Sequence, residues 1–214
     1  MGAYDNLAVR LDRYRPAFVE RPVAPRRGAE VADDDAVFSK ALVQVANLNS
    51  QDQVVVAGTT AGLAEFQHLV SVKPEYRCIP LNTPYAFHSD LMKPVWRHLK
   101  ILLEHVTFAC SRLPIISNAD ASEVREGEAW RCLILQQLFS KVCWKATLEK
   151  LISLGIRTFI EVGPSEVQLR FVRQLSNEAH VFSTRDCDRL SKLFDTAPGS
   201  HEKMHLAFAA RNGA

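Results

Sequence analysis

The chain contains the stretch Thr83-Pro84-Tyr85-Ala86-Phe87-His88-Ser89-Asp90-Leu91-Met92-Lys93-Pro94, in which a histidine lies where an extended segment gives way to a helix. Apolar residues recur every three or four positions from Leu91 to Leu103, which predicts an amphipathic helix over 88–106. Pro94 is compatible with that helix only in its first turns. A histidine at such a junction is more often a cap or a surface group than a catalytic base, so these residues alone do not establish catalysis.

The residues before this stretch predict a small α/β layer. The β-branched run at 53–58 ends in glycine and predicts a strand, a helix follows to about Val70, and 78–81 predicts a second strand. A short apolar element at 37–45 precedes them. Residues 1–35 are poorly patterned: Tyr4–Leu11 could form a strand, and Arg21–Asp35, with its prolines, arginines and aspartates, is interpreted as a loop or a disordered insert.

The residues after this stretch predict helices at 128–139, 144–154 and 167–175, the second of them ended by Gly155. Apolar runs at Leu113–Ser117 and Thr158–Val162 predict strands. We expect these two strands to lie parallel in one sheet. Residues 176–214 have no clear pattern and are expected to form a polar tail.

Composition limits the function classes. The chain has 214 residues, 47% of them apolar, and a formal charge of +2, so neither nucleic acid nor an anionic membrane is expected as a partner. The five cysteines form no C-x-x-C pair and their number is odd, which suits a reducing compartment. There is no membrane-length apolar run and no secretory signal, so we expect a soluble intracellular protein of the cytoplasm or mitochondrion.

Two short motifs suggest other chemistry. Gly58-Thr59-Thr60-Ala61-Gly62 resembles the nucleophile elbow of hydrolases, but a β-branched residue fits that strained turn poorly, and a threonine that caps a helix is the favoured interpretation. His201-Glu202-Lys203-Met204-His205 is a literal H-E-x-x-H, the pattern of zinc peptidases. No third ligand type follows it, so we expect no metal site.

Five strings in register carry a resemblance to a known family. Phe87-His88-Ser89-x-Leu91-Met92-Lys93-Pro94 resembles the histidine motif of the malonyl-CoA:acyl-carrier-protein transacylases, an acyltransferase family. The other four follow the order of that family: they are Asn47–Gly58, Pro114–Ala121, Gln137–Trp144 and Phe159–Pro164. The likeness extends from about 46 to 173. The chain departs from the family at Lys141, where proline is usual, and at Ser165, where glycine is common.

The resemblance implies an α/β fold in two parts, each incomplete. Residues 36–86 would be part of a ferredoxin-like small subdomain, and 87–175 the C-terminal part of a hydrolase-like acyltransferase subdomain. The family has three further parts, all N-terminal: a G-Q-G-x-Q segment, a G-H-S-x-G elbow that carries the serine, and an arginine that pairs the malonyl carboxylate. The sequence contains none of them, so the resemblance covers only the C-terminal half.

The resemblance also implies roles for three residues. His88 would be the general base that serves the family's serine, and Gln137 the uncharged acceptor that orients its imidazole. Phe87 would flank the acyl pocket and favour malonyl over methylmalonyl groups. Malonyl-CoA and acyl carrier protein would be the partners, with no cofactor and no metal.

Two functions remain open at this point. The chain resembles an acyl-carrier-protein S-malonyltransferase of fatty acid synthesis, truncated and without its serine. Alternatively, it is a catalytically inactive interaction module, or one half of a split acyltransferase. In either case we expect no acyl transfer by the isolated chain, because no serine is present for His88 to activate.

Overall fold

The structure is a computed structural model that describes residues 4–11 and 42–195. The chain divides into two compact units. The first unit comprises residues 1–96 together with 138–141, and the second comprises 97–137 and 142–214. Each unit is described by itself.

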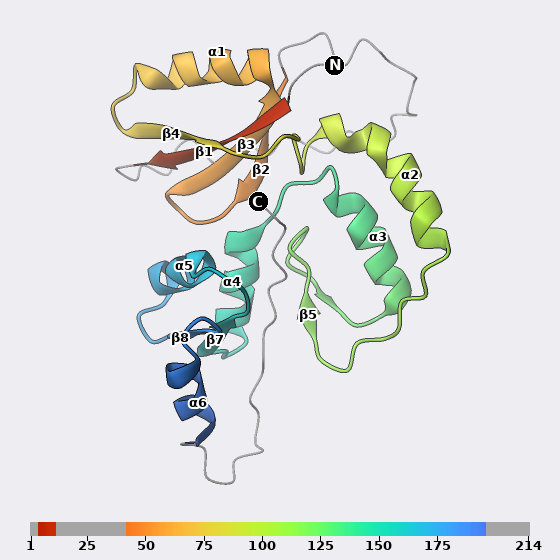
Figure 1. The fold of residues 1–214 in the computed structure, drawn as a ribbon, viewed down its shortest axis with the longest axis vertical. Coiled ribbons are helices and arrows are strands. Elements are labelled where there is room, and N and C mark those ends of the chain that lie inside the picture. Colours follow the sequence, from red (N-terminus) through yellow and green to blue (C-terminus); the bar gives the residue numbers. More distant parts are fainter. Residues whose placement is uncertain (1–3, 12–41, 196–214) are drawn as a thin grey trace. The chain divides into compact units, whose positions relative to one another are not determined.

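The first unit is built on a four-stranded sheet (Figure 1). Its strands are β1 (Tyr4–Leu11), β2 (Val43–Leu48), β3 (Gln53–Thr59) and β4 (Tyr76–Leu81), in the order β2-β3-β1-β4. Every neighbouring pair is antiparallel. The strand interpretation of Tyr4–Leu11 is therefore confirmed, and β1 lies inside the sheet, between β3 and β4, although its flanking sequence is poorly patterned.

Strand β3 is buried on both faces, which explains its run of β-branched residues. Val55 and Ala57 pack on one side, in a cluster with Ala86 and Leu91. Val56 packs on the other side against Leu63 of helix α1 (Thr60–Ser71). The short element that carries His88 thus covers one face of the sheet, and α1 covers the other.

The predicted helix at 88–106 begins later than expected. A single 3₁₀ turn, η3 (Asp90–Met92), precedes α2 (Lys93–Glu104), and Pro94 lies in the first turn of α2, as predicted. Helix α2 carries the chain from the first unit into the second at Trp96.

Besides the end of α2, the second unit contains four helices and four short strands in its described part. The helices are α3 (Gly127–Gln137), α4 (Trp144–Ser153), α5 (Val167–Leu175) and α6 (Cys187–Asp195). The strands are β5 (Ile115–Ile116), β6 (Glu123–Val124), β7 (Thr158–Glu161) and β8 (His180–Ser183). Helix α4 ends where predicted, since Gly155 follows it with a φ of 85°.

The prediction of one sheet for 113–117 and 158–162 is wrong. Strand β5 pairs with β6 in an antiparallel two-stranded sheet, and β7 pairs with β8 in a separate parallel one. The physical reason lies in the turn after β5. Ala121 adopts a φ of 59°, and the Asp120 carboxylate accepts from the Ser122 amide at 3.0 Å, which returns the chain onto β5.

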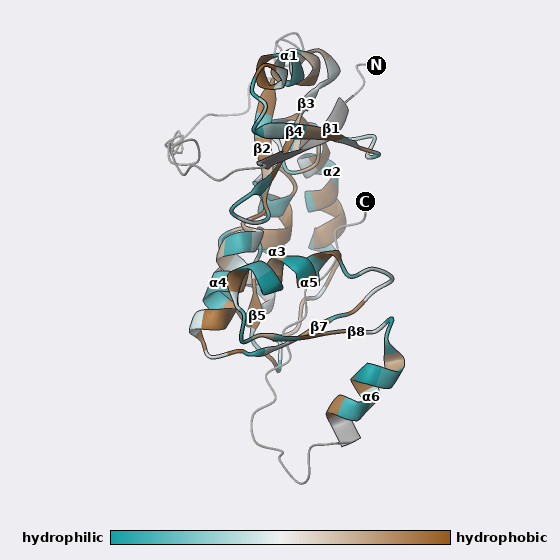
Figure 2. Cartoon of the chain, turned by 90° about the vertical axis from the view of Figure 1, so that its left-hand side faces the viewer, coloured by the Kyte–Doolittle hydropathy of each residue, from teal (hydrophilic) through white to brown (hydrophobic). Residues whose placement is uncertain are grey.

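The prediction of a polar tail at 176–214 is also wrong for part of that range. Residues 180–183 form β8 beside β7, and 187–195 form α6, in which Leu190 and Leu193 are less exposed than their neighbours. Figure 2 shows hydrophilic and hydrophobic residues alternating around α6 and around α4. A sequence this polar on average still forms a helix when its few apolar residues are three apart.

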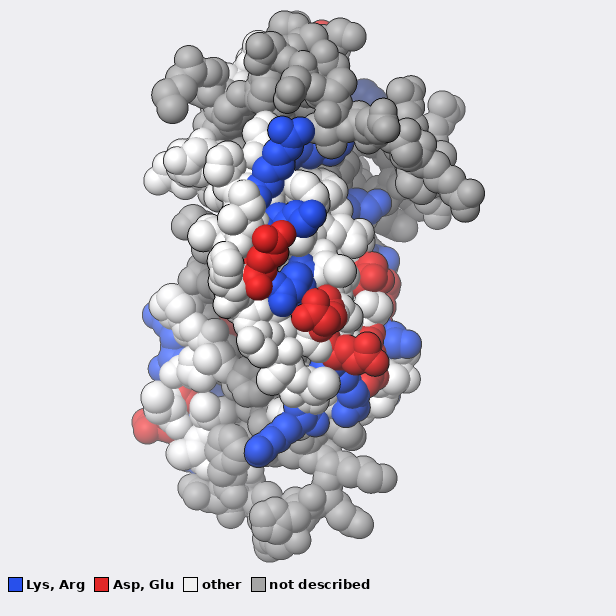
Figure 3. Space-filling model, turned by 90° about the vertical axis from the view of Figure 1, so that its right-hand side faces the viewer, with Lys and Arg blue, Asp and Glu red and all other residues white. Residues whose placement is uncertain are grey.

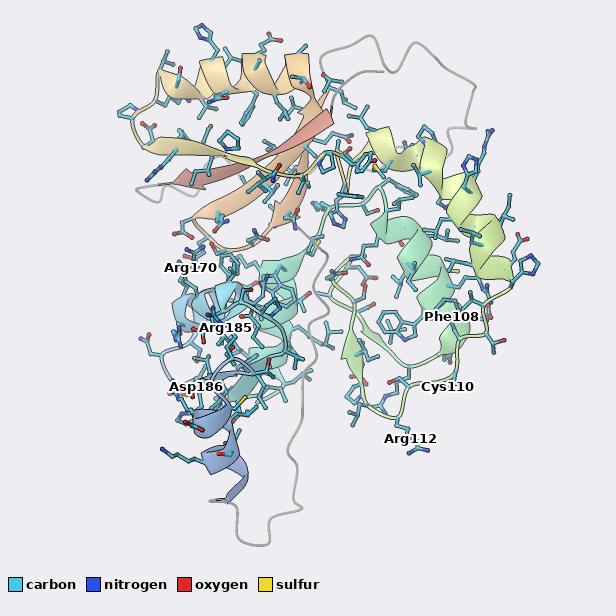
Figure 4. The ribbon with its side chains drawn as sticks, in the orientation of Figure 1. Phe108, Cys110, Arg112, Arg170, Arg185 and Asp186 are labelled. Carbon is cyan, nitrogen blue, oxygen red and sulfur yellow. The ribbon has the colours of Figure 1, made fainter. Side chains whose placement is uncertain are left out.

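The core of the second unit gathers around β7. Phe171 and Leu148 are each 2% exposed, and they pack with Phe159, Leu169 and Val181. Contacts from Arg131 hold the connection between α2 and β5, on which Figure 4 labels Phe108, Cys110 and Arg112. Arg131 of α3 lies 5.3 Å from the Phe108 ring centroid and donates to the Val106 carbonyl at 2.9 Å.

Candidate active site

The residues predicted for the site are distributed over both units. His88 and Phe87 belong to the first unit, in the segment between β4 and η3, and Gln137 is the last residue of α3 in the second. The structure therefore describes two local environments, the histidine turn and the end of α3.

His88 has a left-handed backbone. Its φ is 62°, one of two positive values among the described non-glycine residues. The left-handed region costs an L-residue with a side chain roughly 1–2 kcal/mol, so surrounding contacts must hold it. Such strained backbones concentrate at functional sites.

Hydrogen bonds on both sides of His88 hold this turn. The His88 amide donates to the Leu138 carbonyl at 3.1 Å, a contact within the first unit between residues 50 positions apart in sequence. The Ser89 hydroxyl donates to the Ala86 carbonyl at 2.6 Å, and both of those residues are 1% exposed. The imidazole is half-buried.

A side-chain clamp fixes the residue that begins the 3₁₀ turn. The Gln44 carboxamide of β2 donates to one Asp90 carboxylate oxygen at 2.9 Å and accepts from the Asp90 amide at 2.6 Å. Lys93 pairs with the other carboxylate oxygen at 2.9 Å. Gln44 was not predictable from sequence, because no motif links two residues 46 positions apart.

Phe87 is half-buried and lies beside an exposed aromatic residue. Its ring meets the Tyr85 ring edge to face, with centroids 5.7 Å apart and an interplanar angle of 64°. The Phe87 amide also donates to the Tyr85 carbonyl at 2.9 Å. The ring that is expected to flank an acyl pocket is thus fixed by a local aromatic pair.

Gln137 lies in the lining of a cavity of the second unit. It directly precedes Leu138, whose carbonyl holds the His88 amide. The chain around Gln137 is therefore tied to the histidine turn through the backbone. A hydrogen bond between the Gln137 side chain and the imidazole stays a prediction.

Glu161 lines the same cavity, and its carboxylate already has partners. It accepts from the Gln168 and Leu169 amides at 3.0 and 3.1 Å and from the Ser165 hydroxyl at 3.2 Å. These amides belong to the first turn of α5, where unpaired donors and the helix dipole favour a carboxylate. The acid in the Phe159–Pro164 string is therefore a structural cap.

Other motifs carry no active site in the described part of the chain. Thr59 caps α1, and its hydroxyl accepts from the Gly62 amide at 3.1 Å, which confirms the cap interpretation of 58–62. Asp186, labelled with Arg170 and Arg185 in Figure 4, accepts from the Arg189 amide at the start of α6. His201–His205 lies outside the described residues, and within them no cluster of potential metal ligands occurs.

The electrostatic environment is mixed in sign. On the face shown in Figure 3, Lys and Arg residues are interspersed with Asp and Glu. Burial acts to raise the pKa of Asp120, but hydrogen bonds from Ser122 and Ser117 outweigh it and hold that pKa below its usual value. None of the helices among residues 42–195 has the length and apolarity needed to cross a membrane.

Comparison with known proteins relates the chain to one group of enzymes. No protein-family model matches it. The malonyl CoA-acyl carrier protein transacylase of Bacillus subtilis is 33% identical over 155 residues, which are 72% of this chain and 49% of that protein. The chain is thus homologous to these transacylases over much of its length. It spans about half the length of the curated relatives it matches.

Solved structures support the same fold. The malonyl CoA-acyl carrier protein transacylase from Clostridium perfringens superposes with a TM-score of 0.73 at 24% identity, covering 91% of this chain and 58% of that one. A malonyl-transacylase solved in complex with its type II PKS acyl-carrier protein gives 0.72 at 22% identity, covering 92% and 59%. The chain therefore has a mixed α/β fold that corresponds to part of a transacylase.

Proposed function

We propose, on the premise of this homology, that the chain supplies the histidine-bearing part of an acyl-carrier-protein S-malonyltransferase. The observation that carries the proposal is the histidine turn. A left-handed His88, held by Leu138 beside Gln137 and by the clamped Asp90, is an arrangement that costs backbone energy and fixes the backbone from which the imidazole projects. The sheet order β2-β3-β1-β4 with α1 on one face supports a ferredoxin-like small subdomain.

The chemistry that follows is a ping-pong transfer. A serine hydroxyl attacks the thioester carbonyl of malonyl-CoA, and its proton passes to the neutral His88 imidazole. The imidazolium returns that proton to the leaving CoA thiolate, and a malonyl ester remains on the serine. The thiol of acyl carrier protein then gives its proton to His88 and attacks the ester, and the imidazolium returns that proton to the departing serine oxygen, which regenerates the serine hydroxyl.

Three residues of this chain have roles in the proposal. His88 holds and returns the proton. The Gln137 carboxamide oxygen accepts from the other ring nitrogen and fixes the tautomer. Phe87 limits the space beside the acyl carbon, which favours malonyl over methylmalonyl groups.

The serine has to come from outside these 214 residues, since no G-H-S-x-G motif occurs in them. We therefore expect the isolated chain to take up no covalent label from radioactive malonyl-CoA. A labelled serine or threonine in it would contradict the proposal and would return attention to Thr60.

The test supplies the serine in trans. The probe is the part of the Bacillus subtilis transacylase that precedes its matched residues, here called the N-terminal Bacillus portion, co-expressed with the full chain. We expect malonyl transfer to acyl carrier protein. Substituting His88→Ala should lower the rate about 10²–10⁴-fold, the usual contribution of a general base.

Matched controls separate these roles from general damage. His98 is exposed on α2 and Gln136 is exposed next to Gln137. His98→Ala and Gln136→Ala should leave the rate unchanged, whereas Gln137→Ala should lower it. Equal rates for His88→Ala and the unsubstituted chain would favour the alternative function, a catalytically inactive interaction module.

A further inference from the structure

One side chain of strand β2 reaches the 3₁₀ turn η3, which follows the histidine. Gln44 lies in β2 opposite Ala57 of β3, a residue with no exposed surface (0%). Two positions further along β2, Ala46 packs with Leu91 of η3 in one buried cluster. Strand β2 is therefore a firm support for η3, and Gln44 adds polar contacts to the apolar ones.

The carboxamide of Gln44 matches two groups of Asp90 that differ in hydrogen-bonding character. The Asp90 amide can only donate, and it donates to the Gln44 side-chain oxygen at 2.6 Å. The ionised Asp90 carboxylate can only accept, and it accepts from the Gln44 side-chain nitrogen at 2.9 Å. A carboxamide offers one donor and one acceptor side by side, whereas neither an acid nor an aliphatic side chain at position 44 could make both bonds.

The other partner of the Asp90 carboxylate holds it less firmly. The side chains of Lys93 and Asp90 are 48% and 40% exposed where they form their ion pair. Water screens exposed ion pairs, and two long side chains are costly to hold in one geometry. We therefore attribute the position of Asp90 to Gln44 rather than to Lys93.

The position of Asp90 is transmitted to the histidine through one fixed residue. Only Ser89 separates Asp90 from His88. Ser89 is 1% exposed, its backbone is extended with φ −133° and ψ 165°, and its hydroxyl donates to the Ala86 carbonyl at 2.6 Å. A displacement of Asp90 therefore passes to His88, whose φ of 62° persists only where the surroundings determine it.

We propose that Gln44 is a positioning residue for the general base. Its carboxamide fixes Asp90, and Asp90 in turn sets the left-handed backbone from which the His88 imidazole projects. Gln44 contacts no substrate in this role, since it acts through Asp90 and Ser89. The inference rests on the proposed function, which makes His88 the base, and it adds a residue of another strand on which the transfer rate depends.

The first measurement uses the full chain by itself and needs no transfer. A residue in the left-handed region has its own amide and α hydrogens close together, so His88 should show a strong NOE between them. Gln44→Glu places a second carboxylate against Asp90, and Gln44→Met removes both hydrogen bonds without adding a charge. Each should weaken the NOE roughly twofold or more. A loss of stability alone would leave this NOE of the folded state unchanged.

A double substitution provides the rescue. When Gln44→Glu is combined with Asp90→Asn, the carboxylate at 44 accepts from both the backbone amide and the side-chain amide of residue 90. Two hydrogen bonds then join the residues again, with the side-chain bond reversed in direction, and the NOE of His88 should return. Asp90→Asn alone should weaken the NOE less than Gln44→Glu does, because a carboxamide oxygen at 90 still accepts from Gln44.

The second measurement is malonyl transfer by the full chain co-expressed with the N-terminal Bacillus portion. Gln44→Glu should lower kcat about 10- to 100-fold, the order of loss that a misplaced catalytic group causes. KM for malonyl-CoA should not change, and the double variant should recover most of the lost kcat. Gln51→Glu adds the same charge at an exposed position in the turn between β2 and β3, so this matched control should change neither the NOE nor kcat.

The outcomes distinguish this inference from the proposed function. An unchanged NOE in both Gln44→Glu and Gln44→Met overturns the positioning role, whatever the transfer rate. An altered NOE with an unchanged kcat also overturns it, because transfer would then not depend on the backbone of His88. If the unsubstituted chain transfers no malonyl, the proposed function fails, whereas loss and rescue of the NOE still support Gln44 as the residue that holds His88.

Discussion

The two units differ in how completely their sheets are built. In the first unit, β3 lies between two partner strands, and both of its faces are covered, by α1 and by the segment that carries His88. In the second, β7 has one partner strand and β5 has another, with a cavity between them. Strand β3 therefore has hydrogen-bonded neighbours on both edges, whereas β5 and β7 each pair along one edge only among the described residues.

Hydrogen exchange provides the most direct test of this difference. In the isolated chain, the amides of Val55 and Val56 in β3 should exchange about a hundredfold more slowly than that of Ile160 in β7, which corresponds to ~3 kcal/mol in opening free energy. The reason is that β3 opens only with its whole sheet, whereas β7 is an edge. Exchange is measured residue by residue by NMR. Equal protection in β3 and β7 would end the contrast between the units.

A core substitution tests how small the free energy of unfolding of the second unit is. Phe171 is 2% exposed in the cluster around β7, so Phe171→Ala should cost about 3–5 kcal/mol. Arg173→Ala, at an exposed position of the same helix, is the control and should stay within about 0.5 kcal/mol. Urea unfolding is followed by the fluorescence of Trp130 and Trp144 in a Trp96→Phe background.

The contrast predicts that Phe171→Ala unfolds the second unit and leaves the first unit folded. Far-ultraviolet circular dichroism should therefore retain a second transition at the midpoint of the unsubstituted chain. A single transition shifted as a whole would mean that the two units unfold together. The units would then differ in how their strands pair but not in their free energies of unfolding.

A smaller effect is expected at the clamp on the histidine turn. Gln44→Ala removes both hydrogen bonds to Asp90 and should cost about 1–3 kcal/mol in the first unit. Gln51→Ala, at an exposed position in the turn between β2 and β3, is the matched control. The ¹⁵N and ¹H chemical shifts of the His88 amide provide a second measurement. They should move with Gln44→Ala, because Asp90 helps to hold the left-handed backbone, and they should not move with Gln51→Ala.

Helices α1 to α5 were predictable from sequence because a periodic apolar pattern is a local property, whereas α6 was missed. The predicted helix at 167–175 is the observed α5, and the predicted 144–154 differs from α4 by one residue. The partner strands of β5 and β7 were not predictable, since an apolar run in the sequence does not specify which strand lies beside it. Strand β8 was missed because its two apolar residues, Val181 and Phe182, lie between polar neighbours in a stretch without a clear pattern.

The candidate site was predictable only in part, for the same reason. The motif that contains His88 identifies the histidine, but no sequence pattern indicates a left-handed φ at a residue that is not glycine. The contacts that hold it come from Gln44 and Leu138, which are 44 and 50 positions away. Such contacts depend on the fold of the first unit and become visible only when its sheet is assembled.

The smallest predicted effect concerns the turn that sends β5 back to β6. The Asp120 carboxylate accepts from both the hydroxyl and the amide of Ser122, and its pKa is held below the usual value. A carboxyl whose folded pKa is lower than its unfolded pKa stabilises the fold above the unfolded value of about 4, and that contribution is lost as the pH falls through the folded value. Asp120 is exposed, so the contribution should be about 1 kcal/mol or less. The free energy of unfolding of the chain should therefore exceed that of Asp120→Asn at neutral pH, and the difference should vanish in acid. Glu126→Gln, at an exposed position nearby, is the control and should show no such pH dependence. A difference between Asp120→Asn and the unsubstituted chain that persists in acid would mean that the carboxylate charge does not hold this turn, and another cause would then be needed for the separation of β5 from β7.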